Sequence, residues 1–103
     1  MVAAAELAAM RRTAFLVNSA RAPLVDEDAL MAALRERRIA GAGLDVFWQE
    51  PLPAGHPLCT LDNVVLTPHL GYVTPENLAA FYAGVVDNIR AWLAGREPVP
   101  LSA

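Results

Sequence analysis

The sequence predicts an α/β fold, a partial doubly wound parallel sheet that forms one half of a larger domain. Three short apolar runs, at residues 14–17, 41–47 and 63–67, have the length of strands. The first run is unbroken, which is typical of a parallel sheet that is buried on both faces by helices. Helical segments flank and separate these runs. Three strands are few for an open sheet, so we expect further strands outside these 103 residues.

The first helix is predicted over residues 3–12, which are rich in Ala, Leu and Met. Glu6 stands early in this segment and Arg11 and Arg12 stand late, an order that complements the helix macrodipole. The strand at residues 14–17 follows and stops at Asn18.

A second helix is predicted from Asp26, its N-cap, to Arg38. Acidic residues open this segment and arginines close it, which again fits the dipole. The strand at 41–47 comes next, and we expect its glycines, Gly41 and Gly43, to allow close approach of the preceding helix. Asp45 lies near the end of this strand.

Residues 48–61 contain three prolines and a glycine and are predicted to be a loop. The strand at 63–67 then leads into Pro68 and His69. A long helix is predicted next, with Thr74 as its N-cap and its end near Gly95. Its apolar stripe is interpreted as a surface that packs on its own sheet and on a neighbouring domain.

Composition excludes several classes of function. Eight arginines, with no lysine, stand against 11 acidic residues, giving a net charge of −3, which argues against a nucleic-acid partner. No apolar run approaches the roughly 18 residues that span a membrane, and no secretory signal is visible, so we expect a cytoplasmic protein. A mean hydropathy of +0.33 is high for a small chain and predicts apolar surface that faces something absent from it.

Four functional side chains follow the ends of the predicted strands: Arg21 after the first, Asp45 and Glu50 around and after the second, and His69 after the third. Ligands of open parallel sheets bind beyond these carboxyl ends. An Arg can hold a substrate carboxylate while an imidazole beside an acid moves a proton, which suits hydroxyl–carbonyl redox chemistry. Each residue also has a structural interpretation, such as a surface ion pair for Arg21. Their joint placement favours the functional one.

Other possible sites are weaker. His56, Cys59 and His69 have no recognised metal-ligand spacing, so no metal site is predicted. Cys59 has no neighbour in sequence that would activate it as a nucleophile, and His56 is interpreted as a loop residue. The glycines at 41 and 43 precede a strand and do not form a dinucleotide fingerprint. Trp48 is assigned either to a pocket lining or to a subunit interface.

Three motifs together resemble the C-terminal part of the NAD-binding domain of D-isomer-specific 2-hydroxyacid dehydrogenases, closest to the phosphoglycerate-dehydrogenase-like members. They occur in the order and spacing of that family, and the resemblance covers nearly the whole chain. The motifs are Phe15-Leu16-Val17-Asn18-Ser19-Ala20-Arg21 leading into residues 25–30, Gly41-Ala42-Gly43-Leu44-Asp45-Val46-Phe47 with Glu50-Pro51, and Thr67-Pro68-His69-Leu70-Gly71.

The resemblance implies a Rossmann-type domain and a catalytic role for three residues. Arg21 would bind the substrate carboxylate and carbonyl, His69 would be the acid/base, and Glu50 would keep His69 protonated. It also implies NAD as cofactor, with NADP not excluded, and a small 2-hydroxy or 2-oxo acid as substrate. The residues implied to bind the nicotinamide end are Ala20, Arg21, Asp45, His69 and Gly71.

The resemblance further implies a homodimer for the full-length protein, with a substrate domain and a Gly-rich phosphate loop that this sequence lacks. We therefore expect residues 1–95 to be the second half of a dinucleotide-binding domain, with 74–94 a crossing helix and 96–103 a tail. Isolated, such a catalytic half should be inactive. The alternative hypothesis is a binding or dimerisation module derived from the same scaffold.

Overall fold

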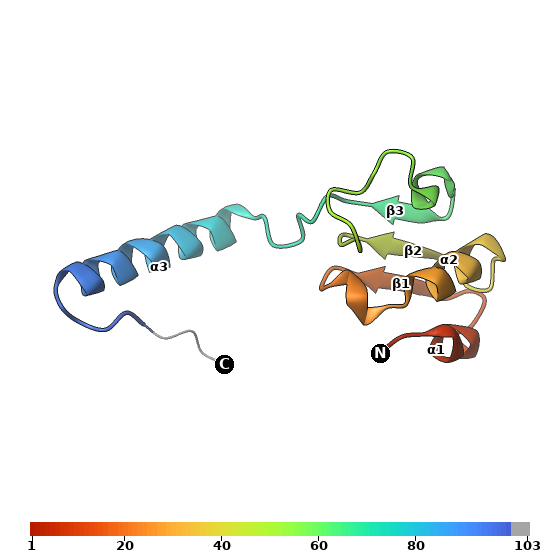
Figure 1. Cartoon of the computed structure of the whole chain (residues 1–103), viewed down its shortest axis with the longest axis horizontal. Helices are drawn as coiled ribbons and strands as arrows, with labels where there is room; N and C mark the ends of the chain where they lie inside the picture. The colour runs from red at the N-terminus through yellow and green to blue at the C-terminus, as the bar shows by residue number, and fades with distance from the viewer. Residues whose placement is uncertain (100–103) are drawn as a thin grey trace. The chain divides into compact units, whose positions relative to one another are not determined.

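The computed structural model describes residues 1–99 and divides into two units, residues 1–71 and a unit that begins at Tyr72 (Figure 1). We describe each unit by itself. The first unit holds two helices, three strands and two 3-10 turns. In chain order these are α1 (Ala4–Ala9), β1 (Phe15–Asn18), η1 (Ala22–Leu24), α2 (Glu27–Arg35), β2 (Gly41–Leu44), η2 (Pro57–Thr60) and β3 (Val64–Leu66).

The three strands form one parallel sheet in the order β1-β2-β3, which confirms the predicted α/β class. Phe15 pairs with Gly41, and Ala42 pairs with Val64, so the strands run nearly level with one another. Their carboxyl ends consequently meet at one edge, where Asn18, Leu44 and Leu66 are the last residues of the three strands.

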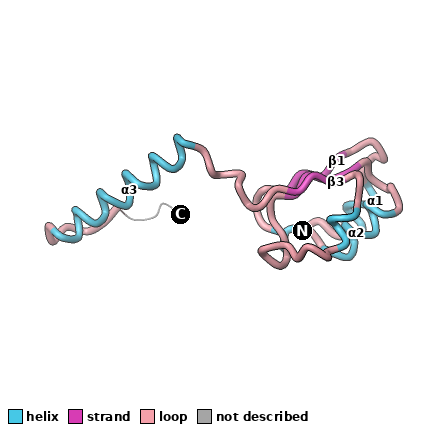
Figure 2. The backbone as a smooth tube through the Cα atoms, turned by 90° about the horizontal axis from the view of Figure 1, so that it is seen from above, coloured by secondary structure: helices cyan, strands magenta, loops and turns pink. Residues whose placement is uncertain are grey.

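Helices cover only one face of this sheet within the first unit. Both α1 and α2 lie on the same side of the strands (Figure 2). On the other face Phe15, Val17 and Val65 are 69%, 77% and 68% exposed. The prediction that the first strand is buried on both faces is therefore wrong for this unit. Side chains alternate along a strand, and the helix of the β1–α2–β2 crossover lies on a single side of the sheet.

The core lies between the covered face and the two helices. It contains Leu7 of α1, Leu30 and Leu34 of α2, Leu44 of β2, and Leu58 of η2. All five are at most 2% exposed. Trp48 and the inward residues of β1 and β3 pack against this cluster. The loop after β2 is thus attached to the core through Leu58 and Trp48.

Both short helices end before the predicted boundaries. Helix α1 stops at Ala9 because Met10 is already extended, so Arg11 and Arg12 lie outside it and do not complement its dipole. Helix α2 ends at Arg35. Two residues later Arg37 takes a left-handed conformation with φ of 52°, which breaks the helix before Arg38.

The start of α2 agrees with its sequence signal. The side chain of Asp26 accepts a hydrogen bond of 2.8 Å from the backbone N–H of Ala29, which confirms Asp26 as the N-cap.

The glycine of β2 that matters for packing faces a neighbouring strand and not the preceding helix. A Cβ atom on Gly41 would collide with the backbone carbonyl oxygen of Asn63, which leads into β3, and would lie 3.2 Å from the ring of Phe15. The predicted close approach at Gly41 is correct, but the predicted partner, the preceding helix, is wrong, because Asn63 and Phe15 make the approach. Parallel strands pack more closely on this residue than the helix does.

The second unit consists mainly of α3 (Pro75–Leu93). Thr74 caps it by accepting a hydrogen bond from the N–H of Asn77, and Gly95 with φ of 67° follows its end, both as predicted. Most of its apolar side chains are exposed within the described part of the chain, so packing of its stripe stays a prediction. None of the helices in residues 1–99 is long and apolar enough to cross a membrane. Part of the predicted tail, residues 100–103, lies outside the described residues.

Replacement of Gly41 by Ala should destabilise the first unit by about 1–3 kcal/mol, because the added methyl group must displace backbone of the adjacent strand. Urea unfolding followed by circular dichroism measures this change. Gly55→Ala is the matched control, since no atom lies within 4 Å of a Cβ built there, and we expect its unfolding free energy to stay within about 0.5 kcal/mol of the parent. Equal stabilities of the two variants would contradict the close approach.

Candidate active site

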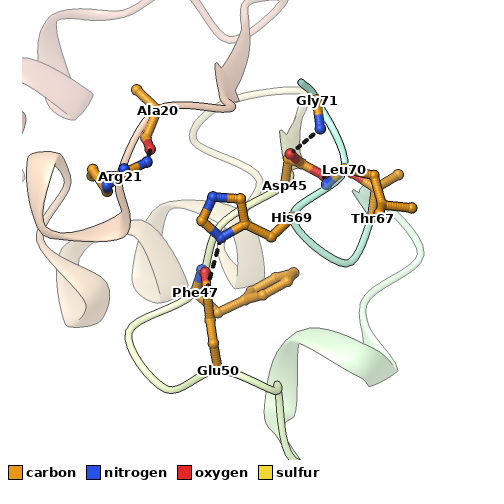
Figure 3. A network of polar contacts seen from close by, with 9 residues as sticks. All are labelled: Ala20, Arg21, Asp45, Phe47, Glu50, Thr67, His69, Leu70 and Gly71. Atoms are coloured by element: carbon orange, nitrogen blue, oxygen red, sulfur yellow. Dashed lines mark hydrogen bonds and ion pairs between the residues drawn. The ribbon is translucent and has the colours of Figure 1, made fainter. Parts of the chain in front are cut away.

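The predicted site residues come together at the carboxyl edge of the sheet. Arg21 follows β1, Asp45 and Glu50 follow β2, and His69 follows β3. Figure 3 shows these side chains on one rim; Asp45 and Glu50 belong to the loop after β2, and Arg21 and His69 belong to the loops after β1 and β3. Parallel pairing explains the convergence, because it brings the loops that follow neighbouring strands to the same edge.

Glu50 and His69 form a direct pair. One carboxylate oxygen of Glu50 (Oε2) lies 2.8 Å from Nδ1 of His69, and the other (Oε1) accepts a hydrogen bond of 2.9 Å from the backbone N–H of Phe47 (Figure 3). The bond to His69, followed by the bond from Phe47, holds the pKa of Glu50 below its ordinary value. The Glu50 carboxylate thus bonds at once to His69 and to the backbone of its own loop.

Arg21 lies on the same rim as this pair. Its guanidinium donates a 2.7 Å hydrogen bond to the carbonyl oxygen of Ala20, and its charge contributes to the lowered pKa of Glu50. The side chain is exposed, so the planar fork is accessible to an anion from solution.

Asn18 is a site-supporting residue that the sequence reasoning missed. It is 7% exposed; its side-chain oxygen accepts from the N–H of Ala20 and its amide donates to the carbonyl oxygen of Arg21. These bonds, of 3.1 and 3.0 Å, fix the turn that presents Arg21. A polar residue at the end of an apolar strand run was the available signal, since a buried amide must find partners.

Asp45 organises the turn that carries His69. Its carboxylate accepts three hydrogen bonds: 2.5 Å from the hydroxyl of Thr67, 2.8 Å from the N–H of Leu70 and 2.7 Å from the N–H of Gly71. These bonds lower the pKa of Asp45, and the bond from Thr67 makes the largest contribution. His69 itself has a φ of 57°, a conformation that non-glycine residues rarely adopt and that the surrounding bonds maintain.

Two cavities adjoin the rim. One of about 360 Å³ lies on the uncovered side of the sheet and is lined by residues from all three strand ends, among them Ser19, Gly43, Asp45 and Gly71. The other, of about 330 Å³, lies beside the Glu50–His69 pair and is mostly apolar, with Phe47 and Leu52 in its wall.

The first cavity lies beyond the carboxyl ends of the parallel strands, where open α/β sheets bind dinucleotides. Of the predicted cofactor residues, Asp45 and Gly71 line it, whereas Ala20, Arg21 and His69 do not. It is narrow at Gly71, where a Cβ would lie 3.0 Å from a carboxylate oxygen of Asp45. The 103 residues contain no Gly-x-Gly-x-x-Gly run, the motif that holds a pyrophosphate in dinucleotide-binding domains.

The family model for the D-isomer specific 2-hydroxyacid dehydrogenase NAD binding domain matches residues 1–71 of the chain. The chain belongs to this family. The match covers the whole first unit and therefore every residue of the rim. The resemblance inferred from the three motifs is confirmed.

Curated relatives and solved structures agree with this assignment. The chain is 49% identical over 96 residues to glyoxylate/hydroxypyruvate reductase B of Enterobacter agglomerans, covering 93% of the chain and 30% of that protein. It is 50% identical over 92 residues to glyoxylate reductase of Thermofilum pendens, covering 89% of the chain and 27% of that protein.

The crystal structure of an NADPH-dependent glyoxylate/hydroxypyruvate reductase from Sinorhizobium meliloti in complex with citrate matches with a TM-score of 0.86 and 40% identity. The match covers 99% of the chain and 32% of that structure. The chain thus spans about a third or less of the dehydrogenases that it resembles.

The side chains considered as metal ligands or as a nucleophile lie in other environments. Within residues 1–99, no three His, Cys, Asp or Glu side chains are grouped as metal ligands would be. Cys59 is an exposed free thiol on η2. His56 is bonded to Glu27 at 3.0 Å, away from the rim.

Replacement of Thr67 by Val should raise the pKa of Asp45, because it removes the largest cause of its lowering. A carboxyl with a lowered folded-state pKa stabilises the fold above its unfolded pKa of about 3.9, and that contribution is lost as the pH falls through the folded value. The variant should therefore be less stable than the parent at neutral pH. The difference between their free energies of unfolding should become smaller at acidic pH.

Carbon-detected NMR titration of Asp45 and urea unfolding at several pH values measure both effects. Thr60→Val is the matched control, since the Thr60 hydroxyl donates to the carbonyl oxygen of Pro57 and to no carboxylate. An unchanged titration of Asp45 in Thr67→Val would contradict the assigned role of the hydroxyl.

Proposed function

We propose that this chain supplies the catalytic edge of an NAD(P)-dependent 2-hydroxyacid dehydrogenase that reduces a small 2-oxo acid such as glyoxylate or hydroxypyruvate. The observation that carries the proposal is the 2.8 Å Glu50–His69 pair on the same rim as Arg21. The reductase names of the relatives support the substrate class.

In this proposal each of the three side chains has one role. Arg21 binds the substrate carboxylate through its planar fork and orients the neighbouring oxo group. His69 donates a proton to the oxo oxygen, and Glu50, ionised and bonded to Nδ1, favours the protonated imidazole that makes this possible. The bound nicotinamide cofactor supplies the hydride. In the reverse direction His69 accepts the hydroxyl proton.

The nicotinamide end of the cofactor is proposed to lie in the cavity at the strand ends. Asp45 and Gly71, which line this cavity, would contact it there, and the backbone around Ala20 and the side chains of Arg21 and His69 would approach it from the rim. The carboxylate of Asp45 accepts three internal bonds, so its contribution to the cofactor is chiefly to shape the turn. NAD is the proposed cofactor, and the NADPH-dependent relative makes NADP the alternative to test beside it.

A second candidate function is a binding or dimerisation module built on the same scaffold. The uncovered sheet face favours it, because Phe15 and Val17 on β1 and Val65 on β3 are exposed apolar side chains on either side of the glycines of β2. A homodimer is proposed for the complete dehydrogenase as well, so oligomerisation alone does not separate the two candidates.

Replacement of His69 by Ala should lower kcat by about 10²–10⁴-fold, the usual contribution of a positioned general acid. The assay uses a chimaera in which this chain replaces the matching segment of glyoxylate/hydroxypyruvate reductase B, with glyoxylate or hydroxypyruvate and either NADH or NADPH. The unsubstituted chimaera is the positive control. Gln49→Ala, at an exposed position of the loop that carries Glu50, is the control variant. Activity of His69→Ala within tenfold of the parent would refute the acid/base role.

Light scattering and cofactor titration of the isolated chain discriminate the second candidate. A binding module should form a discrete, folded oligomer that does not bind NADH or NADPH, because its sheet face would be covered by a second copy. A catalytic segment without its other domains should not form such an oligomer. A discrete cofactor-free oligomer would therefore favour the second candidate over the first.

A further inference from the structure

The loop that carries Glu50 is bonded on both sides to the segment that follows Arg21. Two residues before Glu50, the indole N–H of Trp48 donates a 3.1 Å hydrogen bond to the carbonyl oxygen of Val25. Six residues after it, Nε2 of His56 lies 3.0 Å from the carboxylate of Glu27. Neither contact belongs to the rim, and both join the same two stretches of chain, residues 25–27 and 48–56.

The first contact is closely connected to the carboxylate of Glu50. The side chain of Glu50 closes a small ring by accepting from the backbone N–H of Phe47 at 2.9 Å, and Trp48 lies within that ring. Trp48 is half-buried and packs against the core while its indole N–H reaches the carbonyl oxygen of Val25. The bond from the indole to Val25 therefore sets the orientation of the hydrogen-bonded ring of residues 47–50, and with it the orientation of the Glu50 carboxylate.

The second contact limits the far end of the loop. Nδ1 of His56 accepts a 3.2 Å hydrogen bond from the N–H of Leu58, so its Nε2 carries the proton that is donated to Glu27. Pro51 and Pro53 restrict the backbone between Glu50 and His56. The bond from His56 to Glu27 therefore attaches the end of the loop that carries Glu50 to residues 25–27.

Residues 25–27, which accept the bonds from Trp48 and His56, are held by backbone hydrogen bonds and are connected to Arg21 through η1. The 3-10 turn η1 closes with bonds from Leu24 N–H to the carbonyl of Arg21 and from Val25 N–H to the carbonyl of Ala22, at 3.2 and 3.0 Å. Val2 pairs with Val25 as an isolated parallel bridge and holds the segment from its other side. Val25 and Glu27 are thus placed relative to Arg21 by backbone bonds.

We propose that Trp48 and His56 are positioning residues, which together clamp the Glu50 loop to residues 25–27 and so set where the Glu50–His69 pair lies relative to Arg21. The positioning role rests on the proposed dehydrogenase function, whereas the clamp itself is a property of this chain. Misplacement of a catalytic group by about 1 Å can cost on the order of a hundredfold in rate, which is why such anchors matter.

The first test uses the full chain without substitution. The indole N–H of Trp48 should exchange with solvent at least about tenfold more slowly than that of Trp92, which is 71% exposed and serves as the internal reference in the same ¹H–¹⁵N spectrum. The two indole signals are assigned with Trp92→Phe. Equal exchange rates would overturn the proposal.

The second test measures the titration of Glu50 by carbon-detected NMR in variants of the full chain. Trp48→Phe keeps an aromatic ring on the core but removes the donor, and His56→Leu removes the bond to Glu27. Either change should loosen the bonds that lower the pKa of Glu50, so its acid dissociation constant should fall at least about twofold. His56→Gln can still donate to Glu27 and should restore the parent titration.

Gln49→Ala is the control from the same loop, since this side chain is exposed. Thermal unfolding of every variant is recorded beside the titration. Lower stability with an unchanged Glu50 titration in both Trp48→Phe and His56→Leu would mean that the two residues only stabilise the fold, and would overturn the proposal. No step of the test requires turnover, so the activity of the His69→Ala chimaera decides the dehydrogenase function alone, and the clamp is supported or refuted on its own.

Discussion

Parallel pairing of three short strands is the constraint from which the rest of the structure follows. Because the strands run in the same direction and nearly in register, the loops after Asn18, Leu44 and Leu66 leave the sheet at one edge. Residues that are 48 positions apart in sequence, Arg21 and His69, thereby face the same rim. The close packing that permits this register depends on Gly41, where even a methyl group would meet the adjacent backbone.

Two carboxylates turn this edge into an ordered site. Asp45 accepts bonds from the turn that bears His69, and Glu50 bonds at once to His69 and to the backbone of its own loop. In each case a backbone N–H and a side-chain donor share one carboxylate, so the loop and the functional group are oriented together. The same bonds keep both carboxylates ionised, which links the order of the rim to its electrostatics.

The chain also exposes two apolar surfaces. The sheet face at Phe15, Val17 and Val65 and much of α3 are exposed within the described residues. A sheet buried on both faces is typical of parallel architectures. The chain spans about a third or less of the length of its relatives.

The sequence by itself determined the α/β class, the strand positions to within a few residues, the Asp26 and Thr74 caps, and the four polar residues at strand ends. These features are local, since they depend on apolar runs, capping side chains and the order of elements. The membership of the family also followed from three motifs in the sequence. Helix ends were less predictable because Met10 and Arg37 leave helical geometry without a glycine or proline to mark the change.

Only the tertiary structure decided which of these residues bond to one another. The partners of Asp45 lie more than 20 residues away in sequence, and those of Trp48 and His56 lie 23 and 29 residues away, so no local pattern reports them. Asn18 shows the same limit, because its burial and its bonds around Arg21 arise from the path of the chain after β1. A hydrogen bond requires two groups within about 3 Å, and that distance is set by the packing of strands and loops.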